Sequence, residues 1–396
     1  METTNIDRRK WLKLSAITTG GLLAAPYLGF SKNSTLPLSL DVKGNIVYSP
    51  FFKEYLPESF REFPELKAKL NANENPYGPS PKTIEAFQNA AAGGNRYAWK
   101  ELFQLIDKIA DFEGVSTDNI LMGPGSSDLL EKFAMVLFNE GGNVVSADPA
   151  YMSLIRVAEA CGGTWKPVPL KDWGHNLPAM EAAIDSETKL IYICNPNNPT
   201  GTITDSTELL DFCARVSEKV PIFVDEAYLW FLDDGAKHSM VKLINEGKNI
   251  IVARTFSKIH GMAGLRIGYA VAQKDMVEKI QTITRGGMGI SYPSVFAAMA
   301  AMDDTAFINK SRALNTKTRK YTSESLKSMG FEPVPSYTSF MIFPIAMDGK
   351  AFLSKMTEHK VGVRAFNFME RDWCRVSMGT QAEMELFTSA ISKVLV

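Results

Sequence analysis

Short apolar runs recur along the middle of the chain, and each one changes abruptly to polar residues. Examples are "NILMG", "NVVSA", "KLIYIC", "PIFV" and "NIIVA", and the segments between them carry apolar residues at helical spacing. Such runs, alternating with amphipathic helices, are typical of parallel strands joined by crossover helices. The pattern therefore predicts a large, doubly wound, mostly parallel α/β domain over residues 72–302.

The two flanks of this region have different patterns. Residues 31–71 are rich in proline and aromatic residues, and we expect an extended arm with one short helix that belongs to a smaller domain. Lysine and arginine cluster between Lys310 and Lys327, which favours a long helix, and two or three strands and a terminal helix follow. Residues 303–396 are therefore predicted to form a second, smaller α+β domain.

The first thirty residues resemble a targeting segment. Arg8 and Arg9 precede an apolar stretch from Ala16 to Phe30, which is shorter than the ~20 residues that a membrane-spanning helix needs. Paired arginines before a short apolar region resemble a twin-arginine signal, which is an address read by an export machinery. We expect residues 1–30 to direct export, to the periplasm. The alternative is an amphipathic N-terminal helix of a cytoplasmic protein.

Composition excludes few function classes. The 396 residues are 45% hydrophobic and carry a net charge of −1, so no bias toward nucleic acid is expected. Four cysteines have neither metal-site spacing nor a CxxC pair, and we expect no metal site and mostly free, buried thiols. They are Cys161, Cys194, Cys213 and Cys374.

Polar side chains follow four of the predicted strands. In open α/β sheets ligands bind beyond the carboxyl ends of the strands, so we expect these side chains in one crevice. They are Tyr151, Asn198, Asp225, Tyr228 and Lys258. A lone lysine such as Lys258, in "RTFSKIHGMAGLRIGY", is usually a surface residue. Aligned aspartate, asparagine and tyrosine side chains favour a chemical role instead.

A lysine that reacts as an amine forms a Schiff base, as in enzymes that use pyridoxal 5'-phosphate. Such an enzyme also needs an acid for the pyridine nitrogen, and Asp225 suits that position. Tyr228 and Asn198 can donate hydrogen bonds to the ring phenolate oxygen, and Tyr151 offers a ring for stacking.

A phosphate cradle is predicted from two further stretches. Residues Gly125, Ser126 and Ser127 stand at a helix start, where backbone N–H groups bind phosphate. Ser257 and Arg266 can complete that cradle. Each motif alone is weak, because an aspartate can cap a helix, "NPNNPTG" can be a plain turn, and glycine-rich turns before helices are common. The ordered set is far more specific than any one member.

The ordered motifs resemble those of one family. "NPNNPTG", "DEAY", "TFSK" followed by "GLRIGY", and a late "CRVSMG" resemble the fold-type I, pyridoxal phosphate-dependent aminotransferases of class I/II, over roughly Leu70 to Gly379. "NANENPYGPSP" and "NRYAWK" are similar to the histidinol-phosphate aminotransferase branch. The resemblance implies an aspartate aminotransferase-like fold. It also implies amino transfer between an amino acid or small amine and a 2-oxo acid.

The resemblance also implies residue roles. Lys258 would hold the cofactor and then move the proton, with the other crevice residues placed as above. Arg375 would bind the substrate carboxylate, or the phosphate of histidinol phosphate, and Arg364 is a second candidate for binding an anion. Asn75 and Tyr77 would line the entrance. In this branch the tyrosine matching Tyr97 reaches the phosphate in the other subunit, which implies a homodimer.

Two departures leave the substrate open. After the antiparallel strand the branch usually shows a Pro-Tyr/Phe-Asn stretch, whereas this chain has "RGGMGISYPSV". An export signal also does not suit histidine synthesis. Histidinol-phosphate amino transfer therefore stays an alternative, as do pyridoxal phosphate-dependent decarboxylation, racemisation and oxidation. A non-catalytic binding protein is least favoured, because Lys258 and Asp225 are both present.

Overall fold

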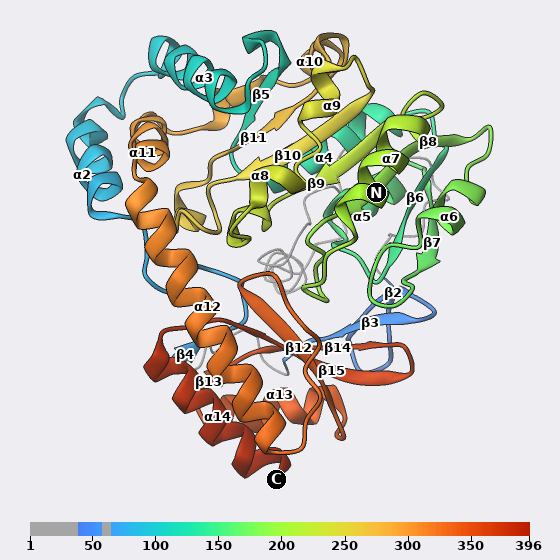
Figure 1. Cartoon of the computed structure of the whole chain (residues 1–396), viewed down its shortest axis with the longest axis vertical. Coiled ribbons are helices and arrows are strands. Elements are labelled where there is room, and N and C mark those ends of the chain that lie inside the picture. Colours follow the sequence, from blue (N-terminus) through green and yellow to red (C-terminus); the bar gives the residue numbers. More distant parts are fainter. Residues whose placement is uncertain (1–38, 58–64) are drawn as a thin grey trace, which may run out of the picture.

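The computed structural model describes residues 39–57 and 65–396, and it shows two domains joined by the long helix α12 (Figure 1). The export signal predicted for residues 1–30 lies outside the described residues. Among the described residues no helix is long and apolar enough to cross a membrane. All four cysteines are free, and only Cys161 is more than slightly exposed, as expected.

The large domain is built on a seven-stranded sheet in the described part of the chain, with the order β5-β11-β10-β9-β8-β6-β7. Only β11 runs antiparallel to its neighbours. The strands are β5 (Ile120–Gly123), β6 (Asn143–Asp148), β7 (Thr164–Pro169), β8 (Thr188–Cys194), β9 (Ile222–Asp225), β10 (Ile250–Thr255) and β11 (Gly268–Val271). The five apolar runs of the sequence form β5, β6, β8, β9 and β10.

Strand β7 was not predicted from the apolar pattern. Its sequence, "TWKPVP", has two prolines and no continuous apolar run. It lies at the sheet edge and pairs only with β6. Proline is tolerated there because an edge strand needs fewer backbone hydrogen bonds.

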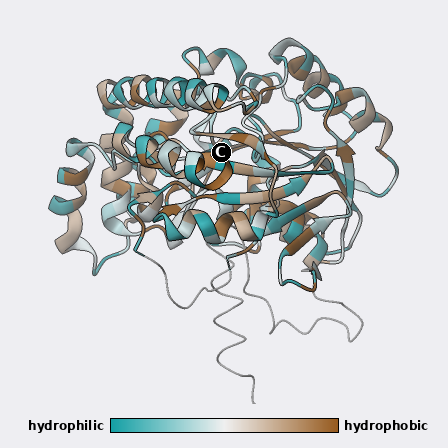
Figure 2. Ribbon diagram, turned by 90° about the horizontal axis from the view of Figure 1, so that it is seen from below, coloured by the Kyte–Doolittle hydropathy of each residue, from teal (hydrophilic) through white to brown (hydrophobic). Residues whose placement is uncertain are grey.

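Both faces of the large sheet are covered by helices. Tyr192 packs on one face and Ile191 and Ile193 on the other, because successive side chains of a strand alternate. The first face is covered by α4 (Ser126–Leu137), α5 (Ser153–Ala160) and α10 (Lys274–Gln281). The second is covered by α3 (Trp99–Glu113), α6 (Leu177–Ala182), α7 (Ser206–Val216), α9 (Lys242–Asn245) and α11 (Tyr292–Asp303). The helices of the molecule carry hydrophobic and hydrophilic residues interspersed along their length (Figure 2), which is typical of helices with one buried face.

Three shorter features complete the large domain. Helix α2 (Pro81–Ala90) packs against α11, beside which it lies in Figure 1. Helix α8 (Gly235–His238) follows β9. Asp304 separates α11 from α12 and caps α12, since its carboxylate accepts a hydrogen bond from the Phe307 N–H at 3.2 Å.

The small domain holds an antiparallel sheet in the order β1-β2-β3-β14-β15-β12. Its strands are β1 (Ser39–Leu40), β2 (Ile46–Ser49), β3 (Phe52–Tyr55), β12 (Phe340–Ile345), β14 (Arg364–Phe368) and β15 (Arg371–Ser377). A separate pair is formed by β4 (Ala68–Lys69) and β13 (Val361–Gly362). One sheet face packs on α12 (Thr305–Ser328), α13 (Gly349–Glu358) and α14 (Gln381–Leu395). The other face turns toward the large domain, where Trp373 meets Trp173 with ring centres 5.4 Å apart.

The described part of the N-terminal arm, residues 39–57 and 65–71, contains short strands. The short helix predicted for the arm stays a prediction, because residues 31–38 and 58–64 lie outside the described part. Strand β3 pairs with β14, so this part of the arm extends the small sheet. The physical reason is that β14 would otherwise present unpaired backbone groups at an edge. Helix α13 was also not predicted, although Asp348 accepts hydrogen bonds from two backbone N–H groups at its start.

Candidate active site

The structure brings the polar residues that follow the strands of the large sheet into one crevice. The Lys258 amine lies 5.6 Å from the centre of the Tyr228 ring. Tyr151 follows β6, and a hydrogen bond of 3.4 Å joins its hydroxyl to that of Ser127. These contacts involve residues that follow four strands, β5, β6, β9 and β10, as expected where the strand ends of such a sheet meet.

Lys258 is not a solvated surface lysine. Its amine is partly buried and lies 3.5 Å from the carbonyl oxygen of Ala72, to which it donates. Burial, followed by repulsion from the Arg375 guanidinium, lowers the pKa of Lys258 to about 8. An amine with this pKa is partly neutral near pH 7, which is the form that reacts with a carbonyl carbon.

Asp225 is a buried acid rather than a helix cap. It ends β9, and no helix begins there. Its carboxylate accepts one hydrogen bond from the Ala227 N–H at 3.1 Å and another from the Tyr192 hydroxyl at 3.4 Å. Burial raises the pKa of Asp225 to about 6 despite these bonds. A cationic ring nitrogen beside the carboxylate would stabilise its charged form.

The start of α4 and the loop after β10 form an anion cradle. The Arg266 guanidinium donates to the Pro124 carbonyl at 3.2 Å and to the Ser257 hydroxyl at 3.4 Å. Gly125 has a φ of +94°, and a Cβ there would lie 2.4 Å from Arg266 Nη2. Ser126 begins α4, where backbone N–H groups have no partner inside the helix. A guanidinium beside a helix N-terminus is suited to a phosphate group.

Arg375 is held across the crevice by the small domain. Its Nη1 donates to the Asn198 side-chain oxygen at 2.7 Å, and its Nη2 lies 3.3 Å from the carbonyl oxygen of Asn71. The guanidinium lies 5.3 Å from the Phe340 ring centre and 5.4 Å from that of Phe366. Its buried Nε has no partner among the described residues. A buried cation with unfilled donor capacity is suited to an anion.

Asn73 is a site residue that the sequence reasoning missed. Its amide nitrogen donates to the Tyr228 hydroxyl at 3.0 Å, and its amide oxygen accepts from the Ser377 hydroxyl at 2.8 Å. Its φ of +54° lies in the left-handed region that asparagine tolerates better than most residues. The three asparagines of "NANENP" were the available signal, but only the fold shows that Asn73 points at Tyr228.

The structure places Asn75 and Tyr77 beside the crevice. The Asn75 amide donates to the Ile259 carbonyl at 2.9 Å and to the Ser311 hydroxyl at 3.2 Å, so it braces the Lys258 loop against α12. The Tyr77 phenol has a raised pKa because of burial and the nearby Glu383 carboxylate of α14. The role predicted for both residues in lining the entrance stays a prediction.

Tyr97 is an exposed residue of the large domain, and Arg364 belongs to the small sheet. Tyr97 is 71% exposed, and its ring centre lies 6.3 Å from that of Trp99. Arg364 stands directly opposite Arg375 in the β14–β15 pairing, and it forms an ion pair with Glu54 of β3. Sequence reasoning did not single out Glu54, because nothing near it in the chain marks it as a partner of Arg364.

A separate cavity of about 170 Å³ contains none of the predicted site residues in its lining. Arg254 faces it and pairs with Glu226 at 3.0 Å and Glu113 at 3.5 Å. The Arg254 guanidinium also lies 4.9 Å from the centre of the Trp230 ring. The charge of Arg254 is thus paired with two carboxylates of the same cluster, whereas the amine, the acid and the anion cradle all border the crevice.

The crevice fits pyridoxal 5'-phosphate, the cofactor that the resemblance implies. A low-pKa amine, a buried acid and an anion cradle are the three groups that this cofactor requires. Glycine at position 125 lets the Arg266 guanidinium approach the start of α4 closely, which places a cation beside the backbone N–H groups there. Among the described residues no cluster of histidine, cysteine or acidic side chains could hold a metal ion.

Comparisons with known proteins agree with this geometry. The model of the family aminotransferase class I and II matches residues 66–391. Histidinol-phosphate aminotransferase of Moorella thermoacetica is 33% identical over 83% of this chain and 85% of its own length. The enzyme of the same name from Akkermansia muciniphila is 35% identical over 86% of this chain and 94% of its own.

A solved structure gives the same answer. The crystal structure of histidinol-phosphate aminotransferase from Sinorhizobium meliloti in complex with pyridoxal-5'-phosphate superposes with a TM-score of 0.78. It is 29% identical and covers 83% of this chain and 90% of that one. The predicted fold class and cofactor are thereby confirmed. The chain belongs to the class I and II aminotransferases, and it is an aminotransferase that depends on pyridoxal 5'-phosphate.

Proposed function

We propose that this enzyme moves the amino group of an amino acid to a 2-oxo acid with the crevice residues in the roles described below. Pyridoxal 5'-phosphate, when bound, supplies an electron sink for the substrate Cα. Asp225 keeps the pyridine nitrogen protonated, because a buried carboxylate strongly favours a cation beside it. Tyr228 and Asn198 hold the phenolate oxygen, and the Tyr151 ring stacks on the cofactor.

The phosphate of the cofactor is proposed to bind at the cradle of Gly125, Ser126, Ser127, Ser257 and Arg266. The support is the position of Arg266, which contacts both loops of the cradle. Backbone N–H groups at the start of α4 add donors that need no side-chain movement. The cradle therefore fixes the cofactor by its phosphate, so that the amine of Lys258 is presented to its reactive carbon.

Lys258 is proposed to carry the proton between the substrate Cα and the cofactor. The observation that supports this role is the environment of the Lys258 amine. The amine is partly buried, has a lowered pKa and lies above the Tyr228 ring. A group whose pKa lies near the working pH can both accept and give a proton. The Ala72 carbonyl, 3.5 Å from the amine, orients it.

Arg375 is proposed to bind the substrate carboxylate. Its unpartnered Nε and its position between two aromatic rings leave it ready to bind an anion. Asn198 joins the two halves of the site, because its oxygen accepts from Arg375 while its amide nitrogen is left for the cofactor. This contact fixes the substrate carboxylate relative to the cofactor ring.

Histidinol phosphate is a second candidate donor. The curated relatives from Moorella thermoacetica and Akkermansia muciniphila carry that activity in their names. The observation that favours it here is the position of Arg364 beside Arg375, since two guanidiniums suit a phosphate. The ion pair between Arg364 and Glu54 weakens this reading.

A homodimer is proposed from the exposed aromatic residues near Tyr97. Trp99 is 54% exposed and Phe103 is 64% exposed, and both lie on α3 close to Tyr97. An exposed apolar surface of this kind favours a second copy of the chain. In such a dimer Tyr97 would reach the partner's phosphate cradle, and light scattering of the holoenzyme tests the assembly.

Export by the twin-arginine machinery is also a proposal, supported only by the Arg8–Arg9 pair before the apolar segment. Changing both arginines to lysine in the full-length protein should keep it inside the cell. Periplasmic protein at the unchanged level would remove this proposal.

The main test is an absorbance titration of the holoenzyme with single amino donors. Glutamate, glutamine, histidinol phosphate, and aromatic and basic amino acids form the panel. A true donor converts the lysine-bound cofactor to its aminated form and leaves the matching oxo compound, which product analysis identifies. Release of carbon dioxide or of the mirror-image amino acid would instead indicate a decarboxylase or a racemase on this scaffold.

A further inference from the structure

Glu54 lies on the small-sheet face that borders the crevice. In the pairing of β3 with β14, Glu54 stands opposite Phe366, and Arg364 is two residues before Phe366 on the same strand. Arg364 in turn stands opposite Arg375. Directly paired residues, and residues two apart, share one face of a sheet. Glu54 and both arginines therefore share the face that meets the substrate.

The carboxylate of Glu54 is bound on both oxygens. One oxygen forms the ion pair with the Arg364 guanidinium, and the other accepts a hydrogen bond of 2.7 Å from the Tyr48 hydroxyl. The side chain of Glu54 is 4% exposed and that of Arg364 is 23% exposed. The acid is thus enclosed, and the arginine is the part of the pair that remains accessible.

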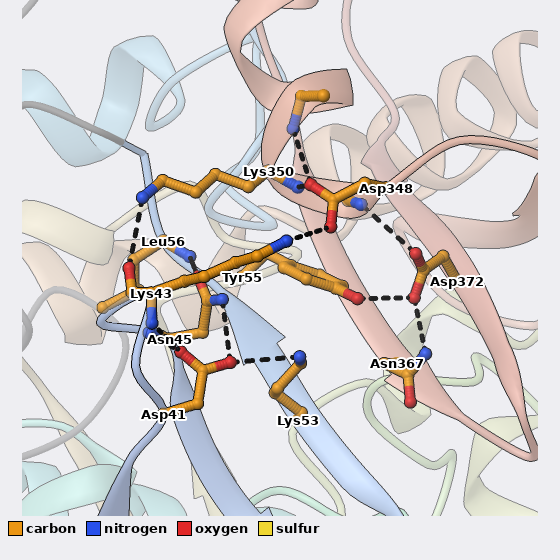
Figure 3. A network of polar contacts seen from close by, with 12 residues as sticks. Asp41, Lys43, Asn45, Lys53, Tyr55, Leu56, Asp348, Lys350, Asn367 and Asp372 are labelled. Atoms are coloured by element: carbon orange, nitrogen blue, oxygen red, sulfur yellow. Dashed lines mark hydrogen bonds and ion pairs between the residues drawn. The ribbon is translucent and has the colours of Figure 1, made fainter.

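Contacts on the opposite face of the sheet fix this arrangement. The Tyr55 hydroxyl donates to the Asp372 carboxylate at 2.8 Å, and the Lys53 amine pairs with Asp41 at 3.1 Å (Figure 3). A slip of one residue would move Glu54 away from the crevice and bring a neighbour of opposite or no charge to its place. The network in Figure 3 therefore keeps an acid, and no other side chain, beside Arg364.

The pair lies next to the cofactor pocket. The Arg156 guanidinium of α5, the helix that follows Tyr151, lies 4.8 Å from the Tyr48 ring centre and donates to the Val47 carbonyl at 2.9 Å. The charges of Arg364, Arg156 and Arg375 all oppose the burial that raises the pKa of Tyr48. Tyr48 therefore lies within electrostatic range of Arg364 and Arg375, the two arginines of this sheet face.

The charges around the substrate follow from these contacts. Glu54 pairs with Arg364, whereas the acceptors of Arg375 within residues 39–57 and 65–396 are the Asn198 side-chain oxygen and the Asn71 carbonyl, and neither carries a charge. One carboxylate of a substrate is satisfied by Arg375. A second anionic group directed at Arg364 would gain little attraction, because Glu54 already offsets the charge of Arg364. It would also be brought close to the Glu54 carboxylate, and like charges repel at short range.

We propose that Glu54 is a specificity-determining residue that makes this enzyme prefer donors with one carboxylate and an uncharged distal group over donors with a phosphate or a second carboxylate. The proposal rests on the proposed function, in which Arg375 binds the substrate carboxylate. The uncharged donors concerned are amino acids with amide, aromatic or aliphatic side chains. Arg375 then binds the substrate carboxylate, whereas Arg364 pairs with Glu54, although the sequence alone does not distinguish the two arginines.

The test uses the holoenzyme and its Glu54→Gln variant with two donors of the same shape, glutamate and glutamine. Glutamine at position 54 keeps a hydrogen-bonding group of the same size for Tyr48 and removes the charge. We expect the ratio of kcat/KM for glutamate over glutamine to rise about tenfold, mostly through glutamate. Histidinol phosphate should improve relative to histidinol in the same direction.

Two controls separate charge in the crevice from a loss of structure. Glu159→Gln removes another partly buried carboxylate, the one that pairs with Arg156 at 3.4 Å, and should leave the ratio within about twofold. The double variant Glu54→Gln with Arg364→Gln should lose most of the gain, because the freed arginine produces it. Equal losses with both donors in Glu54→Gln, or an unchanged ratio, would overturn the proposal.

A binding experiment distinguishes failure of this proposal from failure of the proposed function. Glutarate and pentanoate have the same chain length but two carboxylates and one, and their binding is followed by the cofactor absorbance without turnover. Glu54→Gln should tighten glutarate about tenfold relative to pentanoate. If no donor reacts with the unmodified enzyme while this shift is seen, the proposed function fails and the role of Glu54 stands.

Discussion

The cofactor side and the substrate side of the crevice are built differently. The cofactor side comes from residues at the ends of neighbouring strands of one parallel sheet, such as Asp225 after β9 and Lys258 after β10. The substrate side comes from cross-strand neighbours in an antiparallel sheet, where Glu54 and Arg364 are 310 positions apart in the chain. Short sequence motifs therefore identify the residues of the cofactor side, whereas strand register determines which residues meet on the substrate side.

The two sides also treat charge differently. On the cofactor side burial lowers the pKa of Lys258 and raises the pKa of Asp225, so both pKa values lie closer to pH 7 than usual. On the substrate side Arg364 pairs with a carboxylate, and in the described part of the chain Arg375 donates to neutral acceptors alone. Arg375 links the sides, because its charge contributes to the lowered pKa of Lys258.

The largest effect is expected on the cofactor side. Lys258→Ala removes the amine that reacts with the cofactor, so kcat should fall by about four orders of magnitude or more. Single-turnover absorbance measures the loss, and circular dichroism with thermal unfolding should show an intact fold. A variant that retains full activity would end the assignment of Lys258 as the reactive lysine.

The next largest effect is expected at Arg375. Arg375→Ala should lower kcat/KM for amino acid donors by about a hundredfold or more, because it removes a buried partner of the carboxylate. Arg375→Lys should recover only part of this, since lysine lacks the two-pronged geometry. Steady-state kinetics with the best donor gives the result, and a loss below about threefold would contradict the proposed role.

A smaller effect is expected at Asn73, which joins the two sides. Glycine adopts the left-handed backbone conformation of position 73 without strain, and Asn73→Gly removes the side chain that donates a hydrogen bond to Tyr228. We therefore expect kcat to fall about three- to tenfold. Asn73→Ala should show the same loss and unfold more easily by about 1 kcal/mol, because alanine is strained at φ +54°. Stopped-flow rates and chemical denaturation measure the two parts. Unchanged rates in both variants would remove Asn73 from the site.

The smallest effect is in the pH dependence of cofactor uptake. Lys258 reacts as the neutral amine, and its pKa is about 8, so the neutral fraction grows as pH rises through that value. Incorporation of pyridoxal 5'-phosphate into the apoprotein should therefore speed up about fivefold from about pH 7 to about pH 8.

Arg375→Ala should shift this profile to higher pH, since the repulsion that favours the neutral amine is lost. Stopped-flow absorbance follows both proteins. An identical profile in the variant would show that the two sides of the crevice are electrostatically independent.

Much of the fold was readable from the chain. Five of the large-sheet strands, the long helix α12 and the terminal helix α14 carry strong apolar or charge patterns. Strand β7 was missed because two prolines interrupt its pattern, and the N-terminal strands were missed because short, mixed sequences pair only when an edge is available. Local pattern states which residues prefer burial but not which strand they pair with.

The sequence by itself determined the cofactor side, because its groups stand within a few residues of strand ends and the topology of a parallel sheet gathers those ends at one edge. Only the tertiary structure decided that Asn73 donates a hydrogen bond to Tyr228 and that Glu54 forms an ion pair with Arg364. The physical reason is that these contacts depend on sheet register and on how the two domains meet. Whether a buried charged side chain can bind a ligand also depends on which partners lie close enough to pair with it.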